Sequence, residues 1–151
     1  MQMTLRDVIL AVEAEAKAQP AVNMIVRDDV FRLNDCPAAR YGVFAWTQQQ
    51  HTAPADGDTL RVSLTLYYVD RLNEDASNRL DVQSMAVQVL TNIIRGLPGR
   101  GVWQTGDAAL RTFDQKFLDV CAGAFATLTL AAPYDTLCNT TYDGERSVEI
   151  I

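Results

Sequence analysis

Histidine and cysteine, the side chains most used as metal ligands and nucleophiles, are scarce in this chain. Among 151 residues there is one histidine, His51, and there are three cysteines, Cys36, Cys121 and Cys138, with no CxxC pair. A zinc site needs three or four nitrogen, sulfur or carboxylate ligands, and no local signature of Cys-His catalysis is present. We therefore expect no metal, no cofactor and no catalytic residue, and thiols that stay reduced in a cytoplasm.

Clustered positive charge and long apolar runs are also missing. The chain carries 13 Lys and Arg against 19 Asp and Glu, a formal net charge of -6. Specific duplex binding needs clustered basic residues to neutralise phosphates, so it is not expected, although DNA could pass along an acidic surface without being held. The apolar stretch near the N-terminus is too short and too interrupted by acids for a signal peptide or a membrane span.

The composition that is present fits one globular domain. Hydrophobic residues make up 48% and charged residues 21% of the chain, which are ordinary values for a compact protein. A chain of this size can bury a core without metals or disulfides. We predict a single domain over residues 1–132 and a C-terminal extension or arm over residues 133–151, where periodicity is weak.

The segment from Thr4 to Pro20 predicts an amphipathic helix. Thr4 and Asp7 resemble a capping pair at its start, and Pro20 ends the pattern. The alanine-rich second half is expected to lie near the surface or a partner. Four apolar residues recur at helical spacing: Leu5, Val8, Ile9 and Val12.

A second, longer helix is predicted from Asp75 onward, with stop signals at Gly96 and Pro98. Acidic residues cluster at its beginning, where the helix dipole favours negative charge. The charged stretch "DRLNED" is therefore interpreted as a strand-to-helix connection. The predicted apolar stripe consists of Val82, Met85, Ala86, Val89, Leu90, Ile93 and Leu97.

Several stretches predict strands. "TLRVSLTLYYVD" alternates apolar and polar residues, and "YGVFAWTQQQ" has the aromatic and branched residues of a pleated surface. Residues 21–35 predict either a strand with a tight return or one strand with a break. Residues 101–134 predict strands with turns at "TGD" and "FDQK", and small side chains along residues 120–130 would let the second helix lie close. We predict an α+β fold: a mainly antiparallel sheet packed against the long helix, with an N-terminal helix.

Four motifs could carry chemistry, but each has a plainer interpretation. His51 could act as a base or metal ligand, yet it has no evident partner and is interpreted as a loop residue. "GLPGRG" lacks the Lys-Ser/Thr ending of a phosphate loop, so we interpret it as a helix stop. "DGD" at residues 56–58 lacks calcium-ligand spacing and is interpreted as a hairpin turn. Asp28 and Asp29 are adjacent and are interpreted as a solvated turn.

A set of aromatic residues could form a stacking platform for single-stranded nucleic acid. Basic residues near them are few, so we favour core or subunit contacts. The set comprises Tyr41, Phe44, Trp46, Tyr67, Tyr68 and Trp103.

The chain resembles a group of tailed-bacteriophage proteins, including those of crAss-like phages, in two respects. One is the order of these elements, and the other is the character of the sequence at Tyr41–Ser84, "YGVFAWTQQQHTAPADGDTLRVSLTLYYVDRLNEDASNRLDVQS". The group comprises tail terminators, tail-completion proteins and head-tail connectors. The resemblance implies a non-enzymatic virion protein, made in the bacterial cytoplasm, that forms a hexameric or dodecameric ring around the DNA passage. It would contact portal, connector or tail proteins.

Ring closure requires two complementary surfaces on each copy. We predict one surface at the end of the long strand, formed by Tyr67, Val69, Arg71 and Glu74, and the other at the N-terminal helix or the C-terminal arm. Two other functions stay open: a small cytoplasmic hydrolase or ligand-binding enzyme with a site around His51, and an intracellular adaptor that binds a host protein through its arm.

Overall fold

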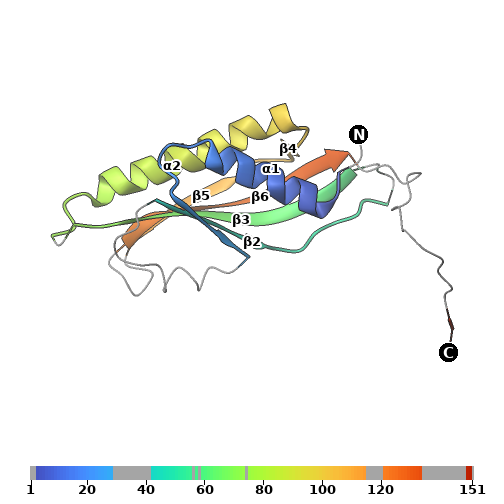
Figure 1. The fold of residues 1–151 in the computed structure, drawn as a ribbon, viewed down its shortest axis with the longest axis horizontal. Helices are drawn as coiled ribbons and strands as arrows, with labels where there is room; N and C mark the ends of the chain where they lie inside the picture. Colours follow the sequence, from blue (N-terminus) through green and yellow to red (C-terminus); the bar gives the residue numbers. More distant parts are fainter. Residues whose placement is uncertain are drawn as a thin grey trace.

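A computed structural model describes residues 3–28, 42–55, 57, 59–73, 75–114, 121–133 and 149–150. Within them the chain forms two layers, a six-stranded sheet and two helices that cover one of its faces (Figure 1). The predicted α+β class is confirmed. The elements are α1 (Leu5–Lys17), β1 (Met24–Arg27), β2 (Val43–Gln48), β3 (Thr59–Arg71), α2 (Arg79–Gly96), the 3-10 helix η2 (Leu97–Arg100), β4 (Trp103–Gln104), β5 (Ala109–Asp114) and β6 (Cys121–Pro133).

The two longest strands, β3 and β6, form the centre of the sheet. They pair antiparallel from Thr59 opposite Pro133 to Arg71 opposite Cys121. On the far side of β3, β2 pairs antiparallel and β1 then pairs with β2 in parallel. On the far side of β6, β4 and β5 both pair antiparallel. The sheet is mainly antiparallel as predicted, and the parallel β1–β2 pair is the exception.

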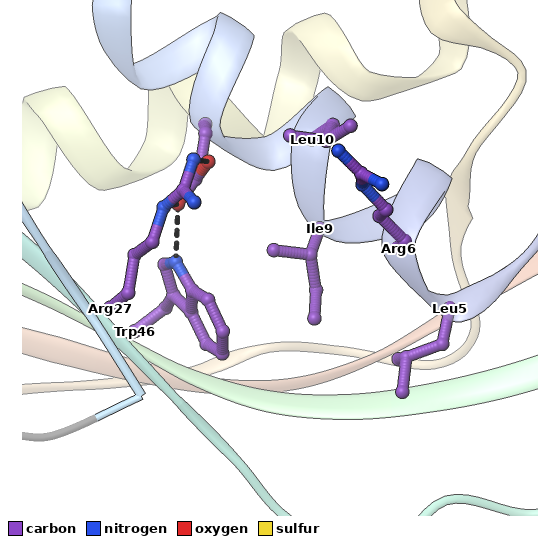
Figure 2. Close-up of a pocket in the computed structure, with 7 residues that line it drawn as sticks. Leu5, Arg6, Ile9, Leu10, Arg27 and Trp46 are labelled. Atoms are coloured by element: carbon purple, nitrogen blue, oxygen red, sulfur yellow. Dashed lines mark hydrogen bonds and ion pairs between the residues drawn. The ribbon is translucent and has the colours of Figure 1, made fainter.

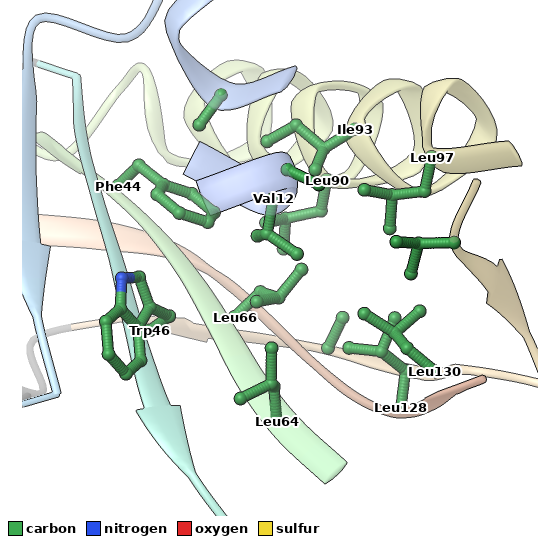
Figure 3. Packing of buried hydrophobic residues seen from close by; sticks show 14 of the residues in the cluster. Val12, Phe44, Trp46, Leu64, Leu66, Leu90, Ile93, Leu97, Leu128 and Leu130 are labelled. Atoms are coloured by element: carbon green, nitrogen blue, oxygen red, sulfur yellow. The ribbon is translucent and has the colours of Figure 1, made fainter. Parts of the chain in front are cut away.

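Side chains alternate across this sheet, and one set of positions forms the main core. The helix-facing residues of β3 and β6, among them Leu64, Leu66 and Leu128, pack with Phe44 of β2 beneath the helices (Figure 3). Burying an aliphatic or aromatic side chain contributes roughly 1.5–3 kcal/mol. The alternation in "TLRVSLTLYYVD" is therefore confirmed as the pattern that attaches the sheet to the helices.

Helix α2 begins later than predicted. Residues before it form a turn in which Asp75 accepts a hydrogen bond from the Ser77 amide at 3.0 Å, and Ala76 has a φ of 55°. The predicted stripe is buried except for Met85, which is 44% exposed, so its assignment to the core is wrong. Position 85 lies beyond the border of the narrow stripe that the sheet covers.

The end of α2 follows the glycine and proline signals. The helix ends at Gly96, η2 continues as a tighter turn, and Gly101 closes it with a left-handed φ of 82°. The "GLPGRG" motif is thus confirmed as a helix stop. Beneath α2, the fully buried Ala124 and Ala126 of β6 belong to the same core cluster as the helix. This agrees with the prediction that small side chains there let the helix lie close to the sheet.

Helix α1 has the predicted capping box. The Thr4 hydroxyl accepts from the Asp7 amide at 3.2 Å, and the Asp7 carboxylate accepts from the Thr4 amide at 2.9 Å. In the second half of the helix, Ala16 is fully buried in the core whereas Ala18 is exposed. The expectation of a surface position there is wrong for Ala16, because its small side chain lets α1 pack closely against its neighbours.

We expect Asp7→Asn to lower the free energy of unfolding by at most about 0.5 kcal/mol at neutral pH, because the carboxylate of the capping box is exposed to solvent and its charge is screened. The hydrogen bonds from the Thr4 amide and hydroxyl lower the pKa of the Asp7 carboxyl. A carboxyl with a lowered folded-state pKa stabilises the protein above its unfolded pKa of about 3.9, and this stabilisation is lost as pH falls through the folded-state value. Urea unfolding of both proteins at several pH values should show their difference shrinking below about pH 4. A difference that stays constant there would contradict the assignment.

Candidate functional site

A pocket of about 340 Å³ lies between α1 and the β1–β2 side of the sheet (Figure 2). Helix α1 supplies most of its lining, because residues four apart lie on one face of a helix. The sheet supplies the opposite wall. The lining residues are Leu5, Arg6, Ile9, Leu10, Glu13, Arg27 and Trp46.

The inner end of the pocket holds a buried carboxylate. Glu13 is 1% exposed and accepts three hydrogen bonds. The Arg27 guanidinium donates through Nε at 2.8 Å and through Nη2 at 2.7 Å, and the Trp46 indole Nε1 donates at 2.8 Å. Charge-assisted, bidentate bonds of this kind are the strong ones. They attach α1 to β1 and β2, and they leave the carboxylate no evident role as a base.

Sequence reasoning missed Glu13, although a signal was present. Leu5, Ile9 and Glu13 follow one another at intervals of four, so the acid continues the apolar row of α1. A charged residue in such a row is seldom buried unless it is paired. Its partners could not be identified from the sequence, because they come from strands 14 and 33 residues away.

The outer part of the pocket combines apolar walls with positive charge. Arg27 keeps a side chain that is 64% exposed although it pairs with Glu13. Arg6 lies across the pocket from it, on the other side of Ile9 (Figure 2), and forms no ion pair within the described residues. Leu10, 40% exposed, adds apolar surface at the rim. The arrangement suits an apolar group that carries a carboxylate or another anion.

His51, the suggested base, serves a structural contact. Its Nδ1 accepts a hydrogen bond from the Ser63 amide at 3.2 Å. With Nδ1 as acceptor, Nε2 carries the proton and donates to the Gln48 Oε1 at 2.9 Å. Both ring nitrogens are therefore engaged in holding the loop after β2 against β3.

The remaining candidates for chemistry do not converge in the part of the chain that is described. Cys121 is buried, and no group of three His, Cys, Asp or Glu there could hold a metal ion. Asp28 directly follows β1 with a φ of 51° and accepts hydrogen bonds from the Gln48 amide and side chain at 3.0 and 2.9 Å, so it connects the end of β1 to β2. Other candidates lie outside the described residues: Cys36, Cys138, Asp29 and the acids of "DGD".

Three of the predicted interface residues, Tyr67, Val69 and Arg71, lie on the sheet face that turns away from the helices, here called the outer face. Tyr67 packs against Phe125 with ring centroids 5.9 Å apart, and Arg71 is exposed. Val69 is buried in a second apolar cluster, so it is less accessible than an interface residue would be. Glu74 lies outside the described residues. The assignment of these residues to a subunit interface stays a prediction.

The aromatic residues do not form one platform. Phe44, Trp46 and Tyr68 are buried in the core between sheet and helices, whereas Tyr67 lies on the outer face and Trp103 is 44% exposed. The core interpretation is confirmed for the three buried rings. Tyr41 lies outside the described residues.

No protein-family model matches the chain, and no curated protein matches it. Among solved structures, that of the bacteriophage SPP1 gp17 protein is similar, with 9% sequence identity and a TM-score of 0.42 over 89% of this chain and 93% of that one.

Neither described helix has the length and apolar character that crossing a membrane requires.

Proposed function

We propose that this protein is a structural component of a tailed-phage virion, and that its copies form a ring around the DNA passage at the head-tail junction or the top of the tail. The sequence resemblance over Tyr41–Ser84 motivates the virion assignment. The groups best suited to chemistry, Glu13 and His51, have their polar atoms occupied by structural hydrogen bonds. This use favours assembly over catalysis.

The observation that carries the ring proposal is that the two outermost strands of the described sheet, β1 and β5, give it unlike edges. Among the described strands, β1 pairs only with β2 and β5 pairs only with β6. The first edge is four residues long and the second is six. The two margins of the sheet are therefore unlike surfaces. Contacts between two unlike surfaces are heterologous, and heterologous contacts close into rings when the rotation between copies allows it.

The first test is the mass of the purified full chain, measured by light scattering over a range of concentrations and compared with particles seen by negative-stain imaging. We expect a closed ring with one copy number. The competing hydrolase would instead be a monomer that turns over a substrate and loses that activity in His51→Ala. A monomer with such His51-dependent activity would contradict the ring proposal.

A second test addresses the predicted interface. We expect Arg71→Glu to shift the protein from ring to smaller species, because a reversed charge at an interface repels its former partner. Arg61→Glu is the matched control, since Arg61 is exposed on the same strand and lies toward its other end. Light scattering at equal concentrations compares them. Equal assembly of both variants would show that this end of β3 is not an interface.

A further inference from the structure

The pocket beneath α1 contains more positively charged than negatively charged side chains. It brings two guanidiniums, Arg6 and Arg27, to one cavity that has a single carboxylate. That carboxylate, Glu13, already accepts from Arg27 and Trp46. A guanidinium has five N–H groups, and Arg27 uses only its Nε and Nη2 toward Glu13. Donors therefore stay available at the mouth of an otherwise apolar pocket.

The chain itself contains a segment with the complementary character. Glu149 and Ile150 are both exposed, and the Ile150 side chain is 92% exposed. Covering an exposed isoleucine removes apolar surface from water, which favours binding. An acid next to an aliphatic residue is the combination that the two arginines and the apolar walls of the pocket can bind.

The position of the end of β6 and the length of chain that follows it allow this contact. The Met3 amide donates to the Pro133 carbonyl at 3.0 Å, so the end of β6 lies beside the start of α1. Fifteen residues lie between Pro133 and Glu149, and this length of chain spans at most roughly 55 Å when extended. A domain of this size has a radius of gyration of about 15 Å. The extension is therefore long enough to reach an adjoining copy.

We propose that the pocket of Arg6 and Arg27 binds the Glu149–Ile150 segment of a neighbouring copy. The inference rests on the proposed homo-oligomer and names one of its contacts. Pocket and segment are two unlike surfaces, as a heterologous ring requires. The contact would cover Leu10 and Ile150, two of the large hydrophobic side chains that a single copy leaves exposed.

Peptide binding tests the pocket without reference to assembly. The probes are a synthetic peptide of residues 145–151 and the same peptide with Glu149→Arg, and the receptors are the full-length Glu149→Arg and Arg6→Glu proteins. Fluorescence anisotropy should show the natural peptide preferring the first receptor and the reversed peptide preferring the second, each by about tenfold or more. Binding without this reciprocal preference, or no binding, would overturn the proposal.

Mixing the two full-length variants tests whether the contact joins different copies. Each variant alone should assemble less than wild type by light scattering, because like charges meet in its pocket. In the mixture every pocket can find a segment of opposite charge, so we expect the wild-type mass to return. Arg95→Glu, a reversal at an exposed position of α2, is the control and should assemble normally.

The remaining outcomes are distinguishable. Single variants that assemble like wild type would overturn the contact. If the double variant Arg6→Glu/Glu149→Arg assembles but the mixture does not, the segment binds within its own chain, which overturns the assignment to a neighbour. If wild type is monomeric at every concentration, the proposed ring fails, while the peptide preferences still decide whether this pocket recognises the segment.

Discussion

Replacing Gly123 with alanine should lower the free energy of unfolding by about 3 kcal/mol. Gly123 lies in β6 and is paired with Val69 on one side and Phe113 on the other. A Cβ atom there would lie 1.9 Å from the carbonyl oxygen of Tyr68. That neighbour is backbone of the central strand, so the methyl group could be accommodated only by separating β3 from β6. Urea unfolding followed by circular dichroism measures the loss.

Gly99→Ala provides the matched control for this change. Gly99 lies in η2, and a Cβ there would meet nothing within 4 Å. Removing a glycine from an unstrained position restricts the unfolded chain and stabilises a protein by about 0.4–1 kcal/mol. The two Gly→Ala variants should therefore move the unfolding midpoint in opposite directions. Equal midpoints would mean that β3 and β6 are not held at the close approach described.

Replacing Glu13 with alanine should cost about 2–3 kcal/mol. The change removes the acceptor of the Trp46 indole and of the Arg27 guanidinium. Removing one partner of a buried ion pair typically costs about 3–5 kcal/mol. The expected loss is smaller here because the Arg27 side chain is 64% exposed and regains water, whereas the Trp46 N–H loses its partner in a buried position.

Two further variants separate the role of Glu13 from a general effect on α1. Glu13→Gln keeps the volume and one carbonyl acceptor, so its loss should be roughly half that of Glu13→Ala. Glu15→Ala removes the pair with Arg100, whose side chain is 41% exposed, and should cost at most about 1 kcal/mol. Urea unfolding ranks the three proteins, and a red shift of Trp46 fluorescence should accompany only Glu13→Ala. If Glu15→Ala were as destabilising as Glu13→Ala, the hydrogen bonds of Glu13 with Arg27 and Trp46 would not be the main attachment of α1.

The elements that sequence reasoning found were those whose signal is local. The capping pair Thr4 and Asp7 predicts the start of α1. The alternation along β3 predicts the buried face of that strand without reference to the elements that pack on it. Met85 shows where this reasoning ends. Its spacing suits the stripe of α2, yet the side chain is exposed, since the width of the covered stripe depends on the sheet beneath it.

Little of the candidate pocket could be predicted from the sequence. Leu5 and Ile9 were recognised as apolar positions of α1, but Arg6, Glu13 and Arg27 were not singled out. Their significance depends on the parallel pairing that sets Arg27 opposite Trp46. Nothing local in residues 21–35 specifies which strand β1 will join, because strand pairing is chosen by packing and by the connection between strands.

By itself, the sequence determined the fold class, the two helices, the buried face of the long central strand and the close fit of α2 on small residues, because periodicity and capping act between residues a few positions apart. Only the tertiary structure decided that β1 runs parallel to β2, that Glu13 is buried against Arg27 and Trp46, and that His51 is a structural residue. Those outcomes depend on which segments pair and pack together, and no local pattern in the sequence specifies that choice.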